Sequence, residues 1–378
     1  MKMRNLSKNA LAVAVGAGLV AAPVLSAQAY EFAISGHINR TIVQLDNGDE
    51  DGIFHADNDS SSSRIRFVGS GDYGAGKAGF TMEHQFESNT TAGLDLPNVA
   101  GGAGDNDSIR KVEGWFSGDW GKISIGQGSD ALDGVTEFDL GGTFNAGVYA
   151  FPVDMMAGVT FVTSAGARNT AGTNVSAAIT TFDGGRRDRI RYDSPSLGGA
   201  LSFAVSHAEG DQIDAHVAGN HEFGQSQFTW AIGFRDQGDA GGTALSGGAI
   251  VADDVDPSTT AASASLLIGN WVFVVSISDR DKDSPATLVG QQEDPESTYA
   301  KVGYKTAGGH NLAVGVGTYD DIALDGDEAD LVQFGWEKAM NKSVILYASW
   351  TEAELDRPSQ PNLEDVTALQ FGTKILFK

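Results

Sequence analysis

The chain has 378 residues, a formal net charge of −25, 49 glycines and no cysteine. The acidic balance argues against a nucleic-acid partner, because binding phosphates requires clustered Lys and Arg. The lack of cysteine excludes a disulfide framework, and beyond the first 29 residues no run of about 18 apolar residues offers a transmembrane helix. Membrane-crossing strands remain possible, since their alternating side chains hide them from hydropathy averaging.

The first 29 residues have the pattern of a secretory signal peptide. Three cations within the first eight residues precede an apolar stretch from Ala10 to Val24, and a small-x-small motif ends at Ala29. The apolar stretch is too short, and too interrupted by glycine and proline, for a membrane anchor. Cleavage after Ala29 is expected to remove three cations and no acid from a chain of 378 residues and charge −25, leaving residues 30–378, 349 residues with charge −28.

From Tyr30 onward, short segments of alternating hydrophobicity are separated by Gly, Asp, Asn and Ser, which predicts about 16 antiparallel strands. The expected strands are 31–45, 63–72, 77–88, 109–118, 121–128, 186–194, 199–208, 211–223, 226–236, 259–269, 271–281, 296–306, 309–319, 329–339, 342–353 and 364–378. A short extra strand is expected near Gly158 to Ser164. Almost no segment has helical periodicity.

The connections favour a barrel over a sandwich. Tight turns, such as Asp72 to Gly76 and Gly269-Asn270, alternate with long polar connections, such as Asp46 to Ser62 and Asn89 to Asp107. A membrane barrel has short turns at its periplasmic rim and long loops at its external rim. Alternation alone would also fit a secreted soluble β-sandwich acting as a binding module or adhesin, which is the alternative from a different class.

Several motifs occur in the order and spacing of a known family. They are GHINR near the start, SRIRFVGSGDYG, WFSGDWGKISIGQ and RIRYDSPSLGGALSFAVS, and the chain ends in QFGTKILF, which resembles the terminal assembly signal of outer-membrane barrels. Together they resemble the Gram-negative general diffusion porin family over the whole mature chain. One departure is Lys378, because the family usually ends on the aromatic residue before it.

The resemblance implies a 16-stranded antiparallel transmembrane β-barrel with an inward-folded third external loop. It implies a homotrimer in the cell outer membrane, in contact with lipid and lipopolysaccharide, through which small hydrophilic solutes and ions diffuse passively. A substrate-selective porin with a binding site in the lumen is the alternative within this class. Neither enzyme activity nor a cofactor is implied.

The connection from Ser129 to Gly185 is far longer than an unstructured loop of a compact domain. Its segment SDALDGVTEFDLGG resembles the constriction segment of the family. The resemblance implies Asp133 and Glu137 as the acidic side of a pore constriction, with Asp130 and Asp139 as further candidates. A solvated acidic loop is the alternative for each of these carboxylates.

Strand parity predicts the basic side of the constriction. If Ile65 and Phe67 face the membrane, Arg64 and Arg66 face the lumen, where a guanidinium avoids a cost of about 2–4 kcal/mol at the bilayer midplane. Besides Arg66, placed by parity, matching to the family favours Arg64 and Arg110 as wall arginines, with Arg187 or Arg186 as a third, and His37 in place of a usual lysine. Within 109–118, parity places Lys111, Glu113 and Trp115 outward, where a subunit interface would shelter them.

No catalytic or metal site is expected. The run from Asp46 to Asp59 offers carboxylates but lacks the spacing and final Glu of an EF-hand, so an exposed acidic loop, bridged to surface lipid by divalent ions, is favoured. Motifs of serine hydrolases, zinc proteases and nucleotide-binding loops are missing. A Ser/His/Asp site assembled in space stays open as a minor alternative. The net charge favours cations in the lumen.

Overall fold

The computed structural model describes residues 30–96, 102–150, 152–169, 171–238, 257–281, 294–360 and 362–378, so the expected signal peptide lies outside the described residues. The strands are β1 (Glu31–Asp46), β2 (Asp51–Asp57), β3 (Arg64–Asp72), β4 (Lys77–Gln85), β5 (Ser108–Gly118), β6 (Gly121–Ser129), β7 (Arg186–Asp193), β8 (Leu201–Ala208), β9 (Ile213–Phe223), β10 (Ser226–Asp236), β11 (Ser258–Ile268), β12 (Trp271–Asp281), β13 (Glu296–Lys305), β14 (His310–Asp320), β15 (Glu328–Ala339), β16 (Val344–Asp356) and β17 (Val366–Phe377). The helical elements are η1 (Asp59–Ser61), η2 (Thr91–Gly93), η4 (Val135–Glu137), η5 (Pro152–Met155), α2 (Val175–Ala178) and η6 (Glu209–Asp211). Within these ranges, none of the helices reaches the length and apolarity of a membrane span.

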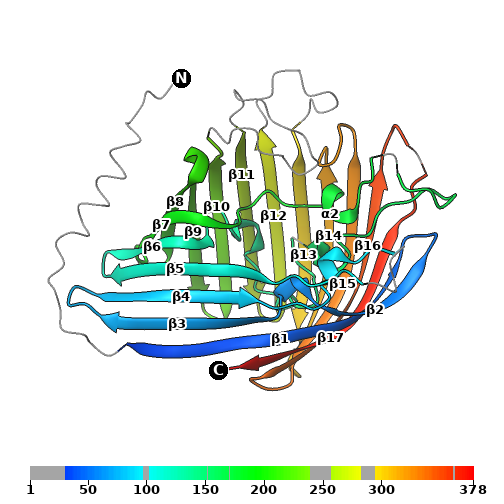
Figure 1. The fold of residues 1–378 in the computed structure, drawn as a ribbon. Helices are drawn as coiled ribbons and strands as arrows, with labels where there is room; N and C mark the ends of the chain where they lie inside the picture. Colours follow the sequence, from blue (N-terminus) through cyan, green and yellow to red (C-terminus); the bar gives the residue numbers. More distant parts are fainter. Residues whose placement is uncertain are drawn as a thin grey trace.

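The strands form one antiparallel sheet that closes on itself (Figure 1). The last strand, β17, pairs with β1 from Gly36–Phe377 to Asp46–Thr367. Both β2 and β3 pair with β1, at its two ends, and η1 separates them, so they are two parts of one barrel strand. The seventeen strands of the sheet therefore fill sixteen positions. Closure confirms the predicted barrel and rules out the sandwich.

Two expectations about local structure were wrong. Strand β2 lies within the connection predicted from Asp46 to Ser62, where Phe54 is buried and Ile53 is exposed in the alternation of a strand. The segment 158–164 forms no strand in the part of the chain described; it makes only isolated bridges, such as Thr160 with Asn174. Strand β2 is short and flanked by polar residues, so its sequence periodicity is weak.

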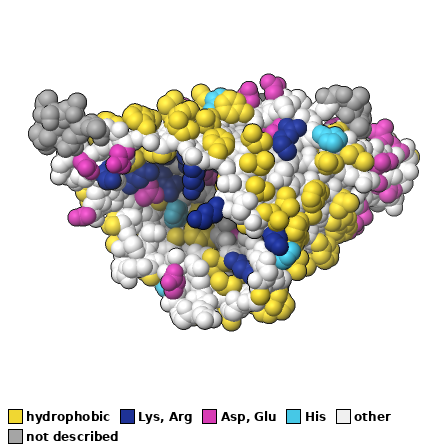
Figure 2. Space-filling view, turned by 90° about the horizontal axis from the view of Figure 1, so that it is seen from below, with side chains coloured by type: hydrophobic (Ala, Val, Ile, Leu, Met, Phe, Trp, Pro, Cys, Tyr) yellow, Lys and Arg dark blue, Asp and Glu magenta, His cyan; other side chains and the backbone are white. Residues whose placement is uncertain are grey.

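The outer surface is apolar and the inner one mixed. In β12, Phe273, Val275 and Ile277 are 46%, 56% and 54% exposed, whereas Ser276 and Ser278, which point the other way, are buried. Exposed apolar residues in every second position are the pattern of a lipid-facing strand. Figure 2, seen from below the view of Figure 1, shows the molecule hollowed near its centre, with Lys and Arg side chains around the hollow.

A β-bulge changes the phase of β5. Opposite it, His84 pairs with Ile109 but Glu83 pairs with Lys111, so Arg110 is an extra residue. An extra residue in one strand reverses the alternation beyond it. The bulge brings Arg110 to the same carboxylate that its neighbour Lys111 faces, and Arg110 Nε donates to Glu83 Oε1 at 2.9 Å.

The bulge corrects the predicted outward placement of Lys111, Glu113 and Trp115. Ile109 and Val112 are the outward residues, 57% and 45% exposed. The other three follow the inward register of β4. No subunit interface is needed to shelter their polar groups.

Glu113 forms a buried ion pair with Arg189 on the inner face. Arg189 reaches it across β6, where Gly128 leaves room: an added Cβ there would lie 2.6 Å from Glu113 Oε2 and 2.7 Å from Arg189 Nη2. The guanidinium also donates to the carbonyl of Ser129 at 2.9 Å and of Gly126 at 3.0 Å. The pair thus ties three strands together.

Replacing one partner of this pair is expected to destabilise the barrel strongly. Arg189→Met should lower the free energy of unfolding by about 3–5 kcal/mol, because it leaves Glu113 buried without a counter-charge. The double variant Glu113→Leu/Arg189→Met should recover most of this loss. Urea unfolding in detergent, followed by tryptophan fluorescence, measures both; equal midpoints for the single and double variants would contradict the assignment.

The apolar core lies inside the barrel, between its wall and the long connection after β6. The wall contributes Val43, Leu45, Tyr299, Tyr319, Leu331, Leu355 and Val366, and the connection contributes Met156, Val159, Phe161, Val175, Ile179 and Phe182. Burial of each such side chain contributes about 1.5–3 kcal/mol. The connection is therefore a packed part of the fold. Figure 1 shows it, in green, crossing the strands from β10 to β16.

Candidate functional site

The connection between β6 and β7, residues 130–185 and here called the insertion, begins and ends at one buried carboxylate. Asp130 Oδ2 accepts a hydrogen bond from Gly185 N at 3.1 Å, and Asp130 N donates to the Gly185 carbonyl at 2.9 Å. The same carboxylate accepts from Arg235 Nη2 at 2.6 Å and lies 3.2 Å from Arg187 Nε. Asp130 thus fixes both ends of the insertion to the wall.

The first part of the insertion runs along β11. Ser263 Oγ donates to the carbonyl of Val135 at 2.5 Å and accepts from Phe138 N at 3.2 Å. Leu140 N donates to Ser265 Oγ at 3.0 Å. Both serines occupy inward positions of β11, so short hydroxyl side chains of the wall satisfy the polar backbone of the insertion.

Farther along, longer side chains of the wall bind the insertion. Lys301 Nζ pairs with Asp139 and donates to the carbonyl of Val148 at 2.7 Å. Glu337 accepts from the backbone and side-chain amides of Asn145, both at 3.0 Å. The insertion has thereby crossed from β11 to β15. Its return is marked by Phe182 N, which donates to Ser278 Oγ of β12 at 3.0 Å.

A glycine of the wall makes room for this path. At Gly335 in β15, an added Cβ would lie 2.4 Å from Val148 Cγ2 of the insertion. Real side chains do not approach one another this closely, so any larger residue at position 335 would displace the insertion.

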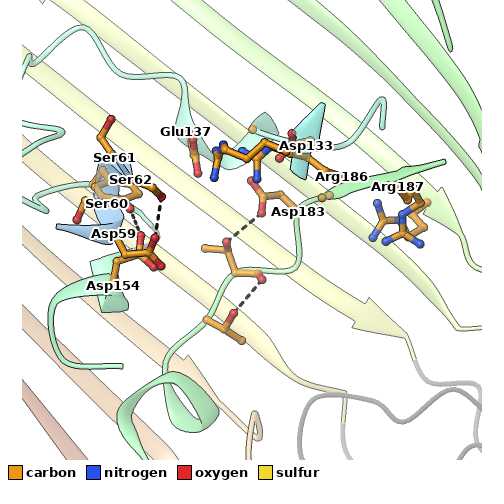
Figure 3. A pocket seen from close by; sticks show the side chains of 18 of the residues that line it. Asp59, Ser60, Ser61, Ser62, Asp133, Glu137, Asp154, Asp183, Arg186 and Arg187 are labelled. Atoms are coloured by element: carbon orange, nitrogen blue, oxygen red, sulfur yellow. Dashed lines mark hydrogen bonds between the residues drawn. The ribbon is translucent and has the colours of Figure 1, made fainter. Parts of the chain in front are cut away.

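The insertion leaves a cavity of about 1100 Å³ between itself and the wall. The charged residues that line it are six carboxylates and six guanidiniums: Asp59, Asp133, Glu137, Asp154, Asp183 and Glu209, and Arg64, Arg110, Arg186, Arg187, Arg235 and Arg280. Figure 3 shows Asp133, Glu137 and Asp183 on the insertion, with the Arg186 side chain extended toward Glu137.

On the basic side of the cavity, one carboxylate pairs with three arginines of the wall. Glu83, buried on β4, pairs with Arg64 at 3.4 Å, with Arg110 at 2.9 Å and with Arg66. One carboxylate cannot neutralise three guanidiniums, so a net positive charge remains on this stretch of the wall. Arg64 Nε also donates to the carbonyl of Ser62 at 2.8 Å, which fixes its direction.

The acidic side is crowded and partly shielded from water. Burial, with Asp183 and Asp133 nearby, raises the pKa of Glu137 to about 8. Burial and the charge of Asp59 raise the pKa of Asp154 to about 7, although the Tyr149 hydroxyl donates to it at 2.7 Å. Burial raises the pKa of Asp183 to about 6. The charge of this side therefore depends on pH near neutrality.

The cavity brings together several of the residues expected at a constriction. Asp133, Glu137, Arg64, Arg110, Arg186 and Arg187 line it. Asp130 and Asp139 do not line it, because they bind wall cations. Arg66 and His37 are not among the residues that line the cavity. Arg66 pairs with Glu83, and His37 Nε2 donates to the carbonyl of Ser62 at 2.9 Å.

Other residues that line the cavity were not predicted from the sequence. Arg280 of β12 follows the inward parity of Ser276 and Ser278, a signal present in the sequence. Its guanidinium lies 4.5 Å from the ring centre of Phe182. Asp154 and Asp183 had no comparable signal, because their positions depend on the path of the insertion.

Comparisons with known proteins agree with this geometry. A comparison with curated proteins gave no match. The solved structure of the anion-selective porin from Comamonas acidovorans is similar, with a TM-score of 0.62 and 16% identity over 92% of this chain and 100% of that one. OmpT of Vibrio cholerae (TM-score 0.57, 12% identity, 94% of this chain, 100% of that one) and the channel DcaP of Acinetobacter baumannii (0.58, 12%, 94%, 100%) share the fold.

The family is shown by the sequence itself. The model of Gram-negative porins matches residues 10–358, nearly the whole chain. The closed barrel, its apolar outer surface and its charged lumen are what an outer-membrane channel requires. The chain belongs to the Gram-negative porin family and forms a diffusion channel of the outer membrane.

Proposed function

We propose that the insertion forms the constriction of this channel, with Asp133 and Glu137 opposite Arg64, Arg110 and Arg186. The observation that carries the proposal is the cavity lined by six carboxylates and six guanidiniums. Opposed charges across a narrow aperture orient water and polar solutes and discourage apolar ones. Small hydrophilic solutes and ions then pass by diffusion, without catalysis or a cofactor.

A planar bilayer tests this proposal. An open porin gives a single-channel conductance that is linear in voltage and does not saturate with salt. Saturation, or block by one solute, would instead indicate the substrate-selective alternative. Silent bilayers would contradict both.

Single charge changes at the aperture are expected to alter ion selectivity. A unit charge acts on an ion about 8 Å away in water with about 0.5 kcal/mol, which is roughly twofold in occupancy. Glu137→Gln should shift the permeability ratio toward anions at alkaline pH, and Arg64→Ala toward cations, each roughly twofold. Reversal potentials in a salt gradient measure this. Asp119→Asn, in an exposed turn away from the cavity, should change nothing; unchanged potentials in all three variants would refute the assignment.

We further propose that the chain assembles as a homotrimer after export. OmpT of Vibrio cholerae has been solved in a trimer form, which supports this state for a barrel of the same fold. An aromatic patch on β1, β4 and β5, including Phe32, Phe80 and Phe116, offers a surface for subunit contact. Removal of residues 1–29 as a signal peptide and contact of the acidic first loop with lipopolysaccharide belong to the same proposal. Native mass spectrometry tests the trimer, and N-terminal sequencing should begin at Tyr30.

A further inference from the structure

The outer surface of the barrel carries an apolar groove of about 500 Å³ across β12 to β17. Its sides are Trp271, Val302, Tyr304, Leu312, Val314, Phe334, Trp336 and Leu369, and small residues, among them Gly303, Gly335 and Ala348, form its floor. The groove forms because large outward side chains stand next to positions that have small side chains or none. Figure 2 shows hydrophobic side chains gathered on the outer surface of the barrel.

The groove lies near the short-turn end of the barrel. Trp271 directly follows the turn at 269–270, and Tyr304 precedes the turn at 306–309. Short turns belong to the periplasmic rim, so the groove opens to the periplasmic leaflet. Along β14, the four residue steps from His310 to Val314, at the far side of the groove, span roughly 13 Å of strand, which is close to the hydrocarbon depth of one leaflet, about 15 Å.

A basic pair stands at the rim of the groove. His310 and Lys338 are direct cross-strand partners, and both point outward. Trp336 Nε1 donates to His310 Nδ1 at 2.9 Å, while Lys338 Nζ lies 3.1 Å from His310 Nε2. A neutral imidazole whose Nδ1 accepts a hydrogen bond carries its proton on Nε2.

The two neighbouring nitrogens, Lys338 Nζ and His310 Nε2, are therefore both hydrogen-bond donors. The ammonium of Lys338 and the Nε2–H of His310 have no acceptor between them, and the ion pairs of the described residues give Lys338 no carboxylate. Such a pair is satisfied by an anionic oxygen that accepts from both nitrogens. The sheet is closed, so no strand edge competes to bind a protein partner here.

We propose that this groove is a binding site for a phospholipid of the periplasmic leaflet. The phosphate accepts hydrogen bonds from Lys338 and His310, and one acyl chain lies along the groove past Trp336. Cations and aromatic side chains at a membrane interface favour this placement of headgroup and chain. The site is separate from the lumen and would not alter the aperture.

Native mass spectrometry of the detergent-solubilised, full-length protein tests the site. The probes are dipalmitoylphosphatidylglycerol, dipalmitoylglycerol, which lacks the phosphate, and inorganic phosphate. Phosphatidylglycerol should stay bound to the wild type. Lys338→Gln should weaken it about tenfold, the loss of one charge-assisted hydrogen bond, and dipalmitoylglycerol should bind the wild type about as weakly.

Two further variants distinguish a bound lipid from a bound free anion. Ala348→Trp fills the groove from the outward face of β16 and should also weaken phosphatidylglycerol, whereas Lys342→Gln, in the exposed turn at the same end, should not. Equal lipid retention in Lys338→Gln and Lys342→Gln would overturn the proposal. So would binding of inorganic phosphate that depends on Lys338 together with lipid binding that ignores Ala348→Trp, because the site would then take a free anion only.

Discussion

Lowering the pH from about 9 to about 5 is expected to move the channel from a weak cation preference to a clear anion preference. The pKa values of Glu137, Asp154 and Asp183 are raised to about 8, 7 and 6, so all three lose their charge across this interval. Guanidinium groups, which line the rest of the cavity, remain charged over this interval. Three charges at about 0.5 kcal/mol each correspond to roughly a tenfold change in the permeability ratio.

Variants identify the groups responsible. Glu137→Gln should remove the part of the change above about pH 7, and Asp154→Asn the part around pH 7, as measured by reversal potentials at each pH. Asp119→Asn serves as the control for an exposed carboxylate. A wild-type permeability ratio that is constant between pH 9 and pH 5 would contradict the proposed acidic side of the constriction.

The raised pKa values of Glu137, Asp154 and Asp183 also make the free energy of folding depend on pH. Carboxyls whose pKa is raised by folding bind protons more tightly in the folded chain than in the unfolded one. Their contribution is therefore fully present below the ordinary carboxyl range near pH 4 and is lost as the pH rises through about 6, 7 and 8. These three carboxyls therefore favour docking of the insertion more at pH 5 than at pH 9.

Sequence periodicity predicted most strands because the two faces of this wall meet different surroundings. In β10, Ile232 and Phe234 face outward and Gly233 and Arg235 inward, as the alternation indicated. The alternation failed beyond Arg110, at Lys111, Glu113 and Trp115, because a bulge depends on hydrogen-bond register with β4 and leaves no compositional trace. It also failed at β2, whose flanking Asp and Asn residues are typical of loops.

The candidate site was predictable only where a side chain is tied to a strand or a motif. Arg64 could be placed by parity, and Glu137 by resemblance to a constriction segment. Asp154 could not be placed, since its position depends on how the insertion packs around Tyr149 and the inner wall. Asp139 carries the same acidic signal as Asp133, yet a lysine more than 160 residues away in sequence removes it from the cavity.

That lysine, Lys301, is a buried polar anchor that contacts the insertion at three residues. It lies fully buried on β13, pairs with Asp139 and donates to Thr143 Oγ1 at 2.9 Å and to the Val148 carbonyl at 2.7 Å. The barrel closes through the pairing of β1 with β17 and does not need these contacts. Loss of Lys301 should therefore loosen the segment of the insertion from Asp139 to Val148 and leave the barrel intact.

Lys301→Met is expected to increase the single-channel conductance roughly 1.5- to 2-fold, because conductance of a water-filled pore follows its narrowest cross-section. Local loosening of this segment is expected because the variant leaves Asp139 without its counter-charge, a cost of about 3–5 kcal/mol at a buried pair. Limited proteolysis should then cut within 130–185, while the heat-modifiable gel shift of the closed barrel stays unchanged. Lys305→Met, on the same strand toward the short-turn end and without an ion pair among the described residues, is the matched control. If both variants conduct like the wild type, the segment from Asp139 to Val148 does not limit the pore.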